Sequence, residues 1–112
     1  MMMTPTSPGP IRLDYDAGQV VPSMGRLAWL AKRAGVRLIA LTQRHSPGGK
    51  GWHLIVTVLP PPRTCMEVVA LQAVFGSDVK REACNINRAR MVDSKQVSPY
   101  WRQRWNVLYG KN

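Results

Sequence analysis

The pattern of apolar and polar residues along the chain predicts three β-strands. In residues 11–16 (IRLDYD) every second residue is apolar, so one face of this strand is expected in the core and the other carries Asp14 and Asp16. Residues 36–43 (VRLIALTQ) and 52–59 (WHLIVTVL) are apolar and rich in β-branched side chains. A glycine-containing segment separates them, which favours a hairpin with a long loop.

Capping residues predict where two helices begin and end. Ser23 can cap the first helix, whose apolar residues recur at helical spacing until Gly35. Thr64 and Glu67 form the two ends of a capping box, which places the start of a second helix there, and Gly76 would end it. The apolar stripe expected on this second helix consists of Met66, Val69, Ala70, Ala73 and Val74.

A third helical segment is expected to begin at Asp78 and to reach about Arg88, with a change to strand near Ile86 as the alternative. Residues 1–10 are rich in Pro, Ser and Thr and are predicted to be a flexible tail. The order of elements predicts an α+β fold in which one small antiparallel or mixed sheet is covered by helices, with residues 11–112 as a single domain.

The balance of charges indicates a polyanionic partner. Lys and Arg number 16 against 6 Asp and Glu, which gives a net charge of +10 and an isoelectric point near 10.7. Proteins of this kind bind nucleic acid because neutralised phosphates release their counterions. A basic surface exposed to solvent, or an acidic protein partner, is the alternative.

Cysteine usage and hydropathy place the chain inside the cell. Cys65 and Cys84 have no CxxC spacing and are expected to be free thiols, and their spacing from His45 and His53 matches no standard zinc cluster. The first residues lack the features of a secretory signal, and no apolar run is long enough to span a membrane. We therefore expect an intracellular, cytoplasmic protein without a membrane partner.

Asp14 and Asp16 are the first candidate site. Residues two apart in a strand share a face, so the two carboxylates could together bind Mg²⁺ or Mn²⁺. Such an ion could activate a 3′-hydroxyl and neutralise a triphosphate. Turn chemistry near Gly18 or simple surface exposure would equally explain two acids at this spacing.

The glycine-rich segment before the third strand is the second candidate. Ser46, Gly49 and Lys50 belong to a turn whose backbone N–H groups and ammonium could hold phosphates, and His53 follows at the start of the strand. The segment lacks the ending of a P-loop and the context of a dinucleotide fingerprint. An ordinary hairpin loop, followed by a histidine satisfied within the core, is the alternative.

Basic residues of the C-terminal part are the third candidate. On the third helix, Arg81, Asn85 and Arg88 share one face and could contact a nucleic-acid backbone, or could simply be solvated. Arg102 and Arg104 alternate with aromatic residues, as in a surface that stacks bases and binds phosphates. The alternative is that Trp101, Trp105 and Leu108, which have helical spacing, pack on the sheet, and we favour burial for one or two of the tryptophans.

With these motifs in this order, the chain resembles the catalytic core of the archaeo-eukaryotic primase superfamily, the primase-polymerases. Residues 13–16 (LDYD) look like the Asp-x-Asp motif of that family, and residues 46–53 (SPGGKGWH) look like its Ser-Gly-x-Gly-x-His turn. The resemblance spans roughly residues 11–90. It implies an RRM-like sheet in which Asp14 and Asp16 bind the catalytic metal.

The same resemblance implies that Gly49, Lys50 and His53 bind the triphosphate of an incoming nucleotide. The family has a third acidic residue, and the position that aligns best with it here holds Asn85, which adds no charge for a second metal. Asp78 could supply the acid, although it also fits a helix cap.

The function expected from the sequence is a minimal primase-like domain that binds nucleotide and nucleic acid through a divalent-metal site, in replication. Its catalytic form would be metal-dependent nucleotidyl transfer, that is, primer synthesis. Its partners would be a single strand or template-primer, a nucleoside triphosphate and a helicase or other replication protein. The alternative is a non-catalytic, basic single-strand-binding module with a degenerate primase fold. A third reading is a small assembly protein whose basic tail docks on a scaffold. The sequence leaves open whether the chain is an enzyme, and it does not distinguish DNA from RNA.

Overall fold

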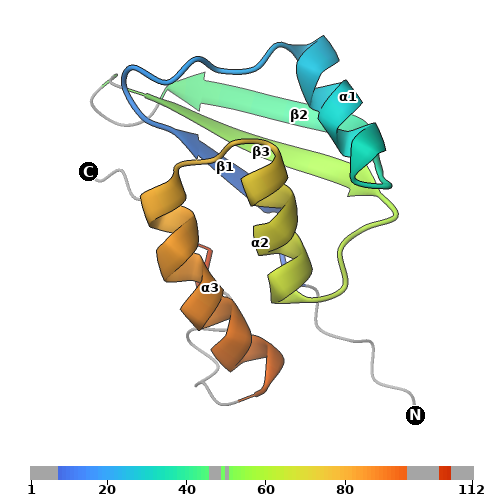
Figure 1. The fold of residues 1–112 in the computed structure, drawn as a ribbon, viewed down its shortest axis with the longest axis vertical. Helices are drawn as coiled ribbons and strands as arrows, with labels where there is room; N and C mark the ends of the chain where they lie inside the picture. The colour runs from blue at the N-terminus through green and yellow to red at the C-terminus, as the bar shows by residue number, and fades with distance from the viewer. Residues whose placement is uncertain (1–7, 46–48, 50, 96–103, 107–112) are drawn as a thin grey trace.

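The computed structural model describes residues 8–45, 49, 51–95 and 104–106. They form one α+β domain in which helices pack on one face of a three-stranded antiparallel sheet (Figure 1). The elements in chain order are β1 (Ile11–Tyr15), α1 (Met24–Arg33), β2 (Arg37–His45), β3 (Trp52–Leu59), α2 (Cys65–Val74) and α3 (Val79–Asp93).

The sheet has the order β1-β3-β2, so β3 is central and both neighbours run antiparallel to it. The predicted α+β class and the hairpin of β2 and β3 are confirmed, and both strand pairings are antiparallel. In the register, Leu13 lies opposite Leu54, and Leu41 lies opposite Val56. β2 extends to His45, two residues further than predicted, because it stays paired with β3 up to Trp52.

The capping residues act as predicted at the first two helices. The Ser23 hydroxyl accepts a hydrogen bond from the Arg26 N–H at 3.1 Å. The Thr64 hydroxyl accepts one from the Glu67 N–H at 3.1 Å, which completes one half of the capping box. Gly35, just past α1, has a φ of +84°, a conformation that glycine adopts without steric cost.

The third helix is longer than predicted. Asp78 caps it by accepting a hydrogen bond from the Arg81 N–H at 3.3 Å. The helix then continues through Ile86 and Arg88 to Asp93, so the alternative of a strand near Ile86 is wrong. The Asp93 carboxylate accepts hydrogen bonds from the first two N–H groups of α2, at 2.8 and 3.0 Å, which fixes the end of α3 beside the start of α2.

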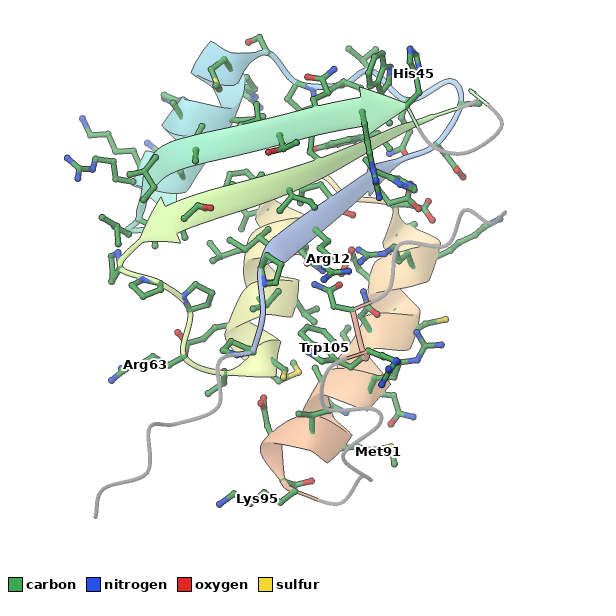
Figure 2. The ribbon with its side chains drawn as sticks, turned by 180° about the vertical axis from the view of Figure 1, so that it is seen from behind. Arg12, His45, Arg63, Met91, Lys95 and Trp105 are labelled. Atoms are coloured by element: carbon green, nitrogen blue, oxygen red, sulfur yellow. The ribbon has the colours of Figure 1, made fainter. Side chains whose placement is uncertain are left out.

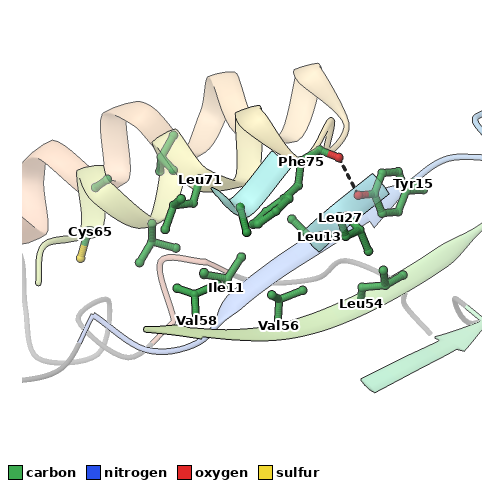
Figure 3. Packing of buried hydrophobic residues seen from close by; sticks show 14 of the residues in the cluster. Ile11, Leu13, Tyr15, Leu27, Leu54, Val56, Val58, Cys65, Leu71 and Phe75 are labelled. Carbon is green, nitrogen blue, oxygen red and sulfur yellow. Dashed lines mark hydrogen bonds between the residues drawn. The ribbon is translucent and has the colours of Figure 1, made fainter. Parts of the chain in front are cut away.

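The core lies between the helices and the inner face of the sheet (Figure 3). Leu13 of β1 and Leu54 of β3 are fully buried there, together with Leu27 of α1. Tyr15 donates a hydrogen bond from its hydroxyl to the Phe75 carbonyl oxygen at 2.7 Å, so its polar end is satisfied (Figure 3). Cys65 and Cys84 are free thiols, as predicted.

The buried face of α2 differs from the predicted stripe. Val68, Leu71 and Gln72 are buried, whereas Ala73 and Val74 are exposed. The reason is that α2 packs against both the sheet and α3, so residues on two sides of the helix lose contact with water.

The outer edge of β1 is covered by polar groups from α2, α3 and the residues around Trp105. An uncovered edge would leave backbone N–H and C=O groups free to pair with another chain. Here each outward-facing group meets a partner, as a fourth strand would provide. The pairs are Pro10 O with Asn106 Nδ2, Arg12 N with Gln72 Oε1, Arg12 O with Arg81 Nη1, Asp14 N with Ser77 Oγ, and Asp14 O with Asp78 N.

The segment before β1 is held against the C-terminal part of the chain. The Trp105 indole N–H donates a hydrogen bond to the Pro8 carbonyl oxygen at 3.1 Å. Trp105 is only 1% exposed and lies between β1 and α3 (Figure 2), which confirms the burial favoured for at least one C-terminal tryptophan. Within the described residues, no helix has the length and apolar character needed to cross a bilayer.

Candidate functional site

Asp14 and His53 form a pair across the sheet, on the face that points away from the core. Asp14 on β1 lies directly opposite His53 on β3 in the strand register. The distance from Asp14 Oδ1 to His53 Nε2 is 3.5 Å. The next residues along each strand, Leu13 and Leu54, are buried in the core on the other side. The alternation predicted for both strands therefore brings this carboxylate and this imidazole together.

Arg44 extends the pair into a row across all three strands. It lies opposite His53 in the register of β2 and β3, so its side chain starts on the same face of the sheet. Its side chain is exposed. A cation, an imidazole and a carboxylate thus follow one another from β2 to β1. The sequence prediction missed Arg44, although the register of a hairpin around the glycine-rich turn could have indicated it.

His53 is a buried polar side chain whose nitrogens lack hydrogen bonds. It is 2% exposed, and neither ring nitrogen has a hydrogen-bond partner within the part of the chain that the structure describes. Burial lowers the pKa of His53, an effect that Asp14 opposes and that Arg44 and Arg81 reinforce. The imidazole is therefore neutral at pH 7 and has an uncompensated donor and an uncompensated lone pair. Leaving such a group unsatisfied costs about 1–3 kcal/mol, which a bound ligand atom would offset.

Asp14 is partly buried, and its environment favours a nearby cation. Its side chain is 17% exposed. Burial raises the pKa of Asp14, His53 and Arg81 oppose the rise, and the neighbouring Asp16 and Asp78 add to it. A cation bound at Asp14 would reduce the repulsion that Asp16 and Asp78 exert on its carboxylate.

Asp16 lies just beyond β1 and is exposed. Its backbone N–H donates a hydrogen bond to Gln19 Oε1 at 2.7 Å, and its carbonyl accepts one from the Gln19 N–H at 3.0 Å. The turn predicted as an alternative near Gly18 is thus present. Asp16 occupies it while staying close enough to Asp14 to affect its pKa.

Gly51 brings the glycine-rich turn against the end of β1. A Cβ atom at this position would lie 2.4 Å from the Tyr15 carbonyl oxygen, so only glycine fits. The sequence prediction did not single out Gly51, although glycine just before a strand is a signal for close backbone approach. Gly49 has a φ of +72° and open space around it, while Ser46 and Lys50 lie outside the described residues. The turn that contains Gly49 and Lys50 therefore starts from the same end of the sheet as the Asp14–His53 pair.

The predicted basic stripe on α3 is not exposed. Arg81 is 6% and Asn85 0% exposed, although they lie on one helical face as expected. That face turns inward. Arg81 forms an ion pair with Glu82 and a hydrogen bond with Asn106. The side-chain amide of Asn85 donates hydrogen bonds to Glu82 and to Asn106. The prediction of a solvent-facing stripe was wrong because burying these polar groups depends on partners far away in the chain.

The other predicted nucleic-acid contacts are distributed differently. Arg88, on the same helix, is half-buried. Arg104 is exposed next to the buried Trp105, as expected. Arg102 and Trp101 lie outside the described residues.

The two candidates for a third acidic residue have separate positions. Asn85 is enclosed by Glu82 and Asn106, so its amide contributes to the interior of the protein. Asp78 is bonded through its backbone N–H to the Asp14 carbonyl at 2.7 Å and raises the pKa of Asp14. Asp78 is therefore the acid beside the Asp14–His53 pair, and it caps α3 at the same time. Among the described residues, no three His, Cys, Asp or Glu side chains are arranged as a metal-binding group.

Comparison with known proteins does not assign the chain. No protein-family description matches it, and no curated protein or solved structure matches it.

The arrangement itself can do three things chemically. Asp14, with Asp16, can ligate a hard cation, the His53 imidazole can donate to or accept from a ligand, and Arg44 can pair with a phosphate.

Proposed function

We propose that this protein is a minimal primase-like domain that binds a nucleoside triphosphate and a divalent metal at the end of the sheet marked by Asp14 and His53. The observation that carries the proposal is the unsatisfied, buried His53 imidazole 3.5 Å from the Asp14 carboxylate, beside the close approach of Gly51 to β1. A histidine left without hydrogen bonds in the apo protein is an expected feature of a site that a ligand completes.

In this proposal, Asp14 and Asp16 would hold one Mg²⁺ or Mn²⁺ ion, which would neutralise charge on the phosphates of the nucleotide. His53 and Arg44 contact the phosphates from the adjacent strands, and Gly49 and Lys50 contribute from the turn. The net charge of +10 adds a general attraction for the triphosphate.

Nucleotidyl transfer is the catalytic form of the proposal. In this reaction the 3′-oxygen would form a bond to the α-phosphorus, the bond from that phosphorus to the β-phosphate oxygen would break to release pyrophosphate, and the hydroxyl proton would pass to solvent. A bound metal would lower the pKa of the attacking hydroxyl and neutralise charge on the α-phosphate. Asp14 and Asp16 position that ion, and His53 and Arg44 hold the phosphates in line for displacement. Template, primer and a helicase or other replication protein would be the further partners of such an enzyme.

A second candidate is a non-catalytic single-strand-binding module. The observation that favours it is the inward position of Asn85, which stands where the resembled family has its third acid. In this version the chain keeps the charge and the open sheet face but joins no nucleotides.

Calorimetry with Mn²⁺ and a nucleoside triphosphate tests the proposal. The wild-type protein should bind the triphosphate only with the metal present, and Asp14→Asn should lose this binding while preserving side-chain volume. Glu67→Gln is the matched control, since it removes one exposed carboxylate at the start of α2. Equal binding by wild type and Asp14→Asn would overturn the metal site. Metal-independent strand binding by both proteins, without triphosphate binding, would select the non-catalytic module.

A further inference from the structure

The solvent face of α1 presents one large aromatic side chain among cations. Leu27 and Ala31 are buried on the inner side of the helix, whereas Trp29 is 48% exposed on the outer side. The guanidinium groups of Arg26 and Arg33 lie 4.7 and 5.2 Å from the centre of the Trp29 ring. These are cation–π distances, so the two arginines are already gathered around the indole.

The surrounding part of the chain has no acidic residue. Between Asp16 and Glu67 the sequence contains neither Asp nor Glu. This stretch supplies α1, β2 and β3, and α1 packs beside β2, the outer strand of the sheet (Figure 1). The positive residues in it are Arg26, Lys32, Arg33, Arg37, Arg44, Lys50 and Arg63.

We propose that this outer face of α1 is a binding surface for single-stranded nucleic acid, separate from the Asp14–His53 site. One unpaired base stacks on the Trp29 ring, which any base can do because each has a π-face. The guanidinium groups of Arg26 and Arg33, which lie over the ring in the free protein, leave it to the base and pair with the phosphates on either side of that base. Lys32 and Arg37, both exposed, add charge along the path of the strand.

The geometry favours a nucleic-acid strand over an anionic membrane. A membrane-binding helix buries a continuous apolar face in the lipid. On α1 the continuous apolar face, with Leu27 and Ala31, is already used by the protein core. On a helix of 3.6 residues per turn, Lys32, Arg33 and Arg26 are the neighbours of Trp29 on the outer side. A single ring surrounded by cations matches one base and its phosphates.

The test measures the binding of a fluorescein-labelled oligothymidylate at several salt concentrations. Arg26→Gln/Arg33→Gln should weaken binding at least tenfold and reduce the slope of log K against log salt by about 1.4, since each phosphate contact on a single strand contributes about 0.7. Trp29→Leu should weaken binding by about tenfold with little change in slope, because it removes stacking and no charge.

The control for total charge is Lys80→Gln/Arg90→Gln, which removes two exposed cations of α3, on the other side of the molecule from α1 (Figure 1). Its affinity and slope should change much less than those of the α1 double variant. Equal losses in both double variants would show general charge attraction and overturn the proposal. Thermal unfolding followed by circular dichroism checks that each variant is folded.

Three further outcomes decide the assignment. Duplex DNA bound as tightly as the single strand would overturn the stacking role of Trp29. Binding to anionic phosphatidylserine vesicles that depends on Trp29, without a Trp29-dependent loss of oligonucleotide binding, would also overturn the proposal. Asp14→Asn should bind the oligonucleotide as the wild type does, and Trp29→Leu should keep triphosphate binding, so this surface and the Asp14–His53 site succeed or fail separately.

Discussion

Asp14 Oδ1 lies 3.5 Å from His53 Nε2, directly across the pairing of β1 with β3. The pair is held by the backbone register and by the polar groups that cover the edge of β1, among them Ser77 bonded to the Asp14 N–H. The imidazole itself contributes no hydrogen bond to the fold. A side chain that the fold positions but does not use is available for a ligand.

Replacing His53 should leave the free energy of unfolding unchanged or raise it by about 1 kcal/mol. His53→Phe removes two unsatisfied buried nitrogens and keeps an aromatic ring of similar shape. Urea unfolding measures the effect. Leu54→Ala, next in the strand and fully buried on the core side, should lose about 2–5 kcal/mol. A His53→Phe loss as large as that of the control would mean that the imidazole is a structural group.

The pH dependence of stability should contain a contribution from His53. Its folded-state pKa is lowered below the ordinary value of 6.5, so below that value the unfolded state binds more protons than the folded state. The wild type should therefore lose stability relative to His53→Phe as the pH falls from 6.5 through the folded pKa. The pKa of Asp14 is raised above 3.8, so the contribution of Asp14 to stability falls as the pH rises from 3.8 through its folded-state pKa. Because His53 also lowers the pKa of Asp14, comparing the urea unfolding of the two proteins at several pH values measures the contribution of His53 together with its effect on Asp14. A difference that does not vary with pH would contradict the burial of a neutral imidazole.

Gly51→Ala should destabilise the protein by about 1–3 kcal/mol and weaken any ligand binding at the Asp14–His53 pair. The added Cβ would meet the Tyr15 carbonyl oxygen at 2.4 Å, which forces the turn away from β1. Gly25→Ala is a suitable control because it lies inside α1 with nothing within 4 Å of the new Cβ. That substitution should stabilise the protein by about 0.5–1 kcal/mol. Chemical denaturation of the two variants would disprove the close approach if both were stabilised alike.

Arg81→Ala should lower the free energy of unfolding by about 3–5 kcal/mol. It leaves the buried Glu82 carboxylate without its cationic partner and removes the side-chain donor to the Arg12 carbonyl oxygen. Arg90→Ala, an exposed arginine later on the same helix, should change stability by less than about 1 kcal/mol. Urea unfolding again gives the comparison. If Arg81→Ala were as stable as Arg90→Ala, the network that covers β1 would not be a stabilising element.

The sequence was sufficient for the elements that local patterns determine. Ser23, Thr64 and Asp78 cap the helices as expected, and the alternation of side chains along β1 correctly placed Asp14 on the face opposite to Leu13. That Asp14 and His53 lie opposite each other follows from the register of β1 against β3, which the sequence did not show. Local spacing also placed Arg81 and Asn85 on one helical face. It could not show that this face points inward.

Burial of these polar residues depends on contacts between distant parts of the chain. The Arg81 side chain meets the Arg12 carbonyl and Asn106, and Gln72 connects Arg12 with Glu82. Such contacts leave no periodic signal in the sequence. The role of Arg44 was missed for a related reason, since its position follows only from the register of β2 against β3.

The most direct test of the proposed site is the NMR signal of the His53 imidazole during titration with Mg²⁺ and a nucleoside triphosphate. The protein has two histidines, so the exposed His45, which stacks on Trp52, serves as an internal control. The account predicts that the His53 resonances shift only when metal and nucleotide are both present, that His45 shifts much less, and that Asp14→Asn abolishes the His53 shift. Unchanged His53 resonances at a saturating concentration of metal and nucleotide would contradict the account.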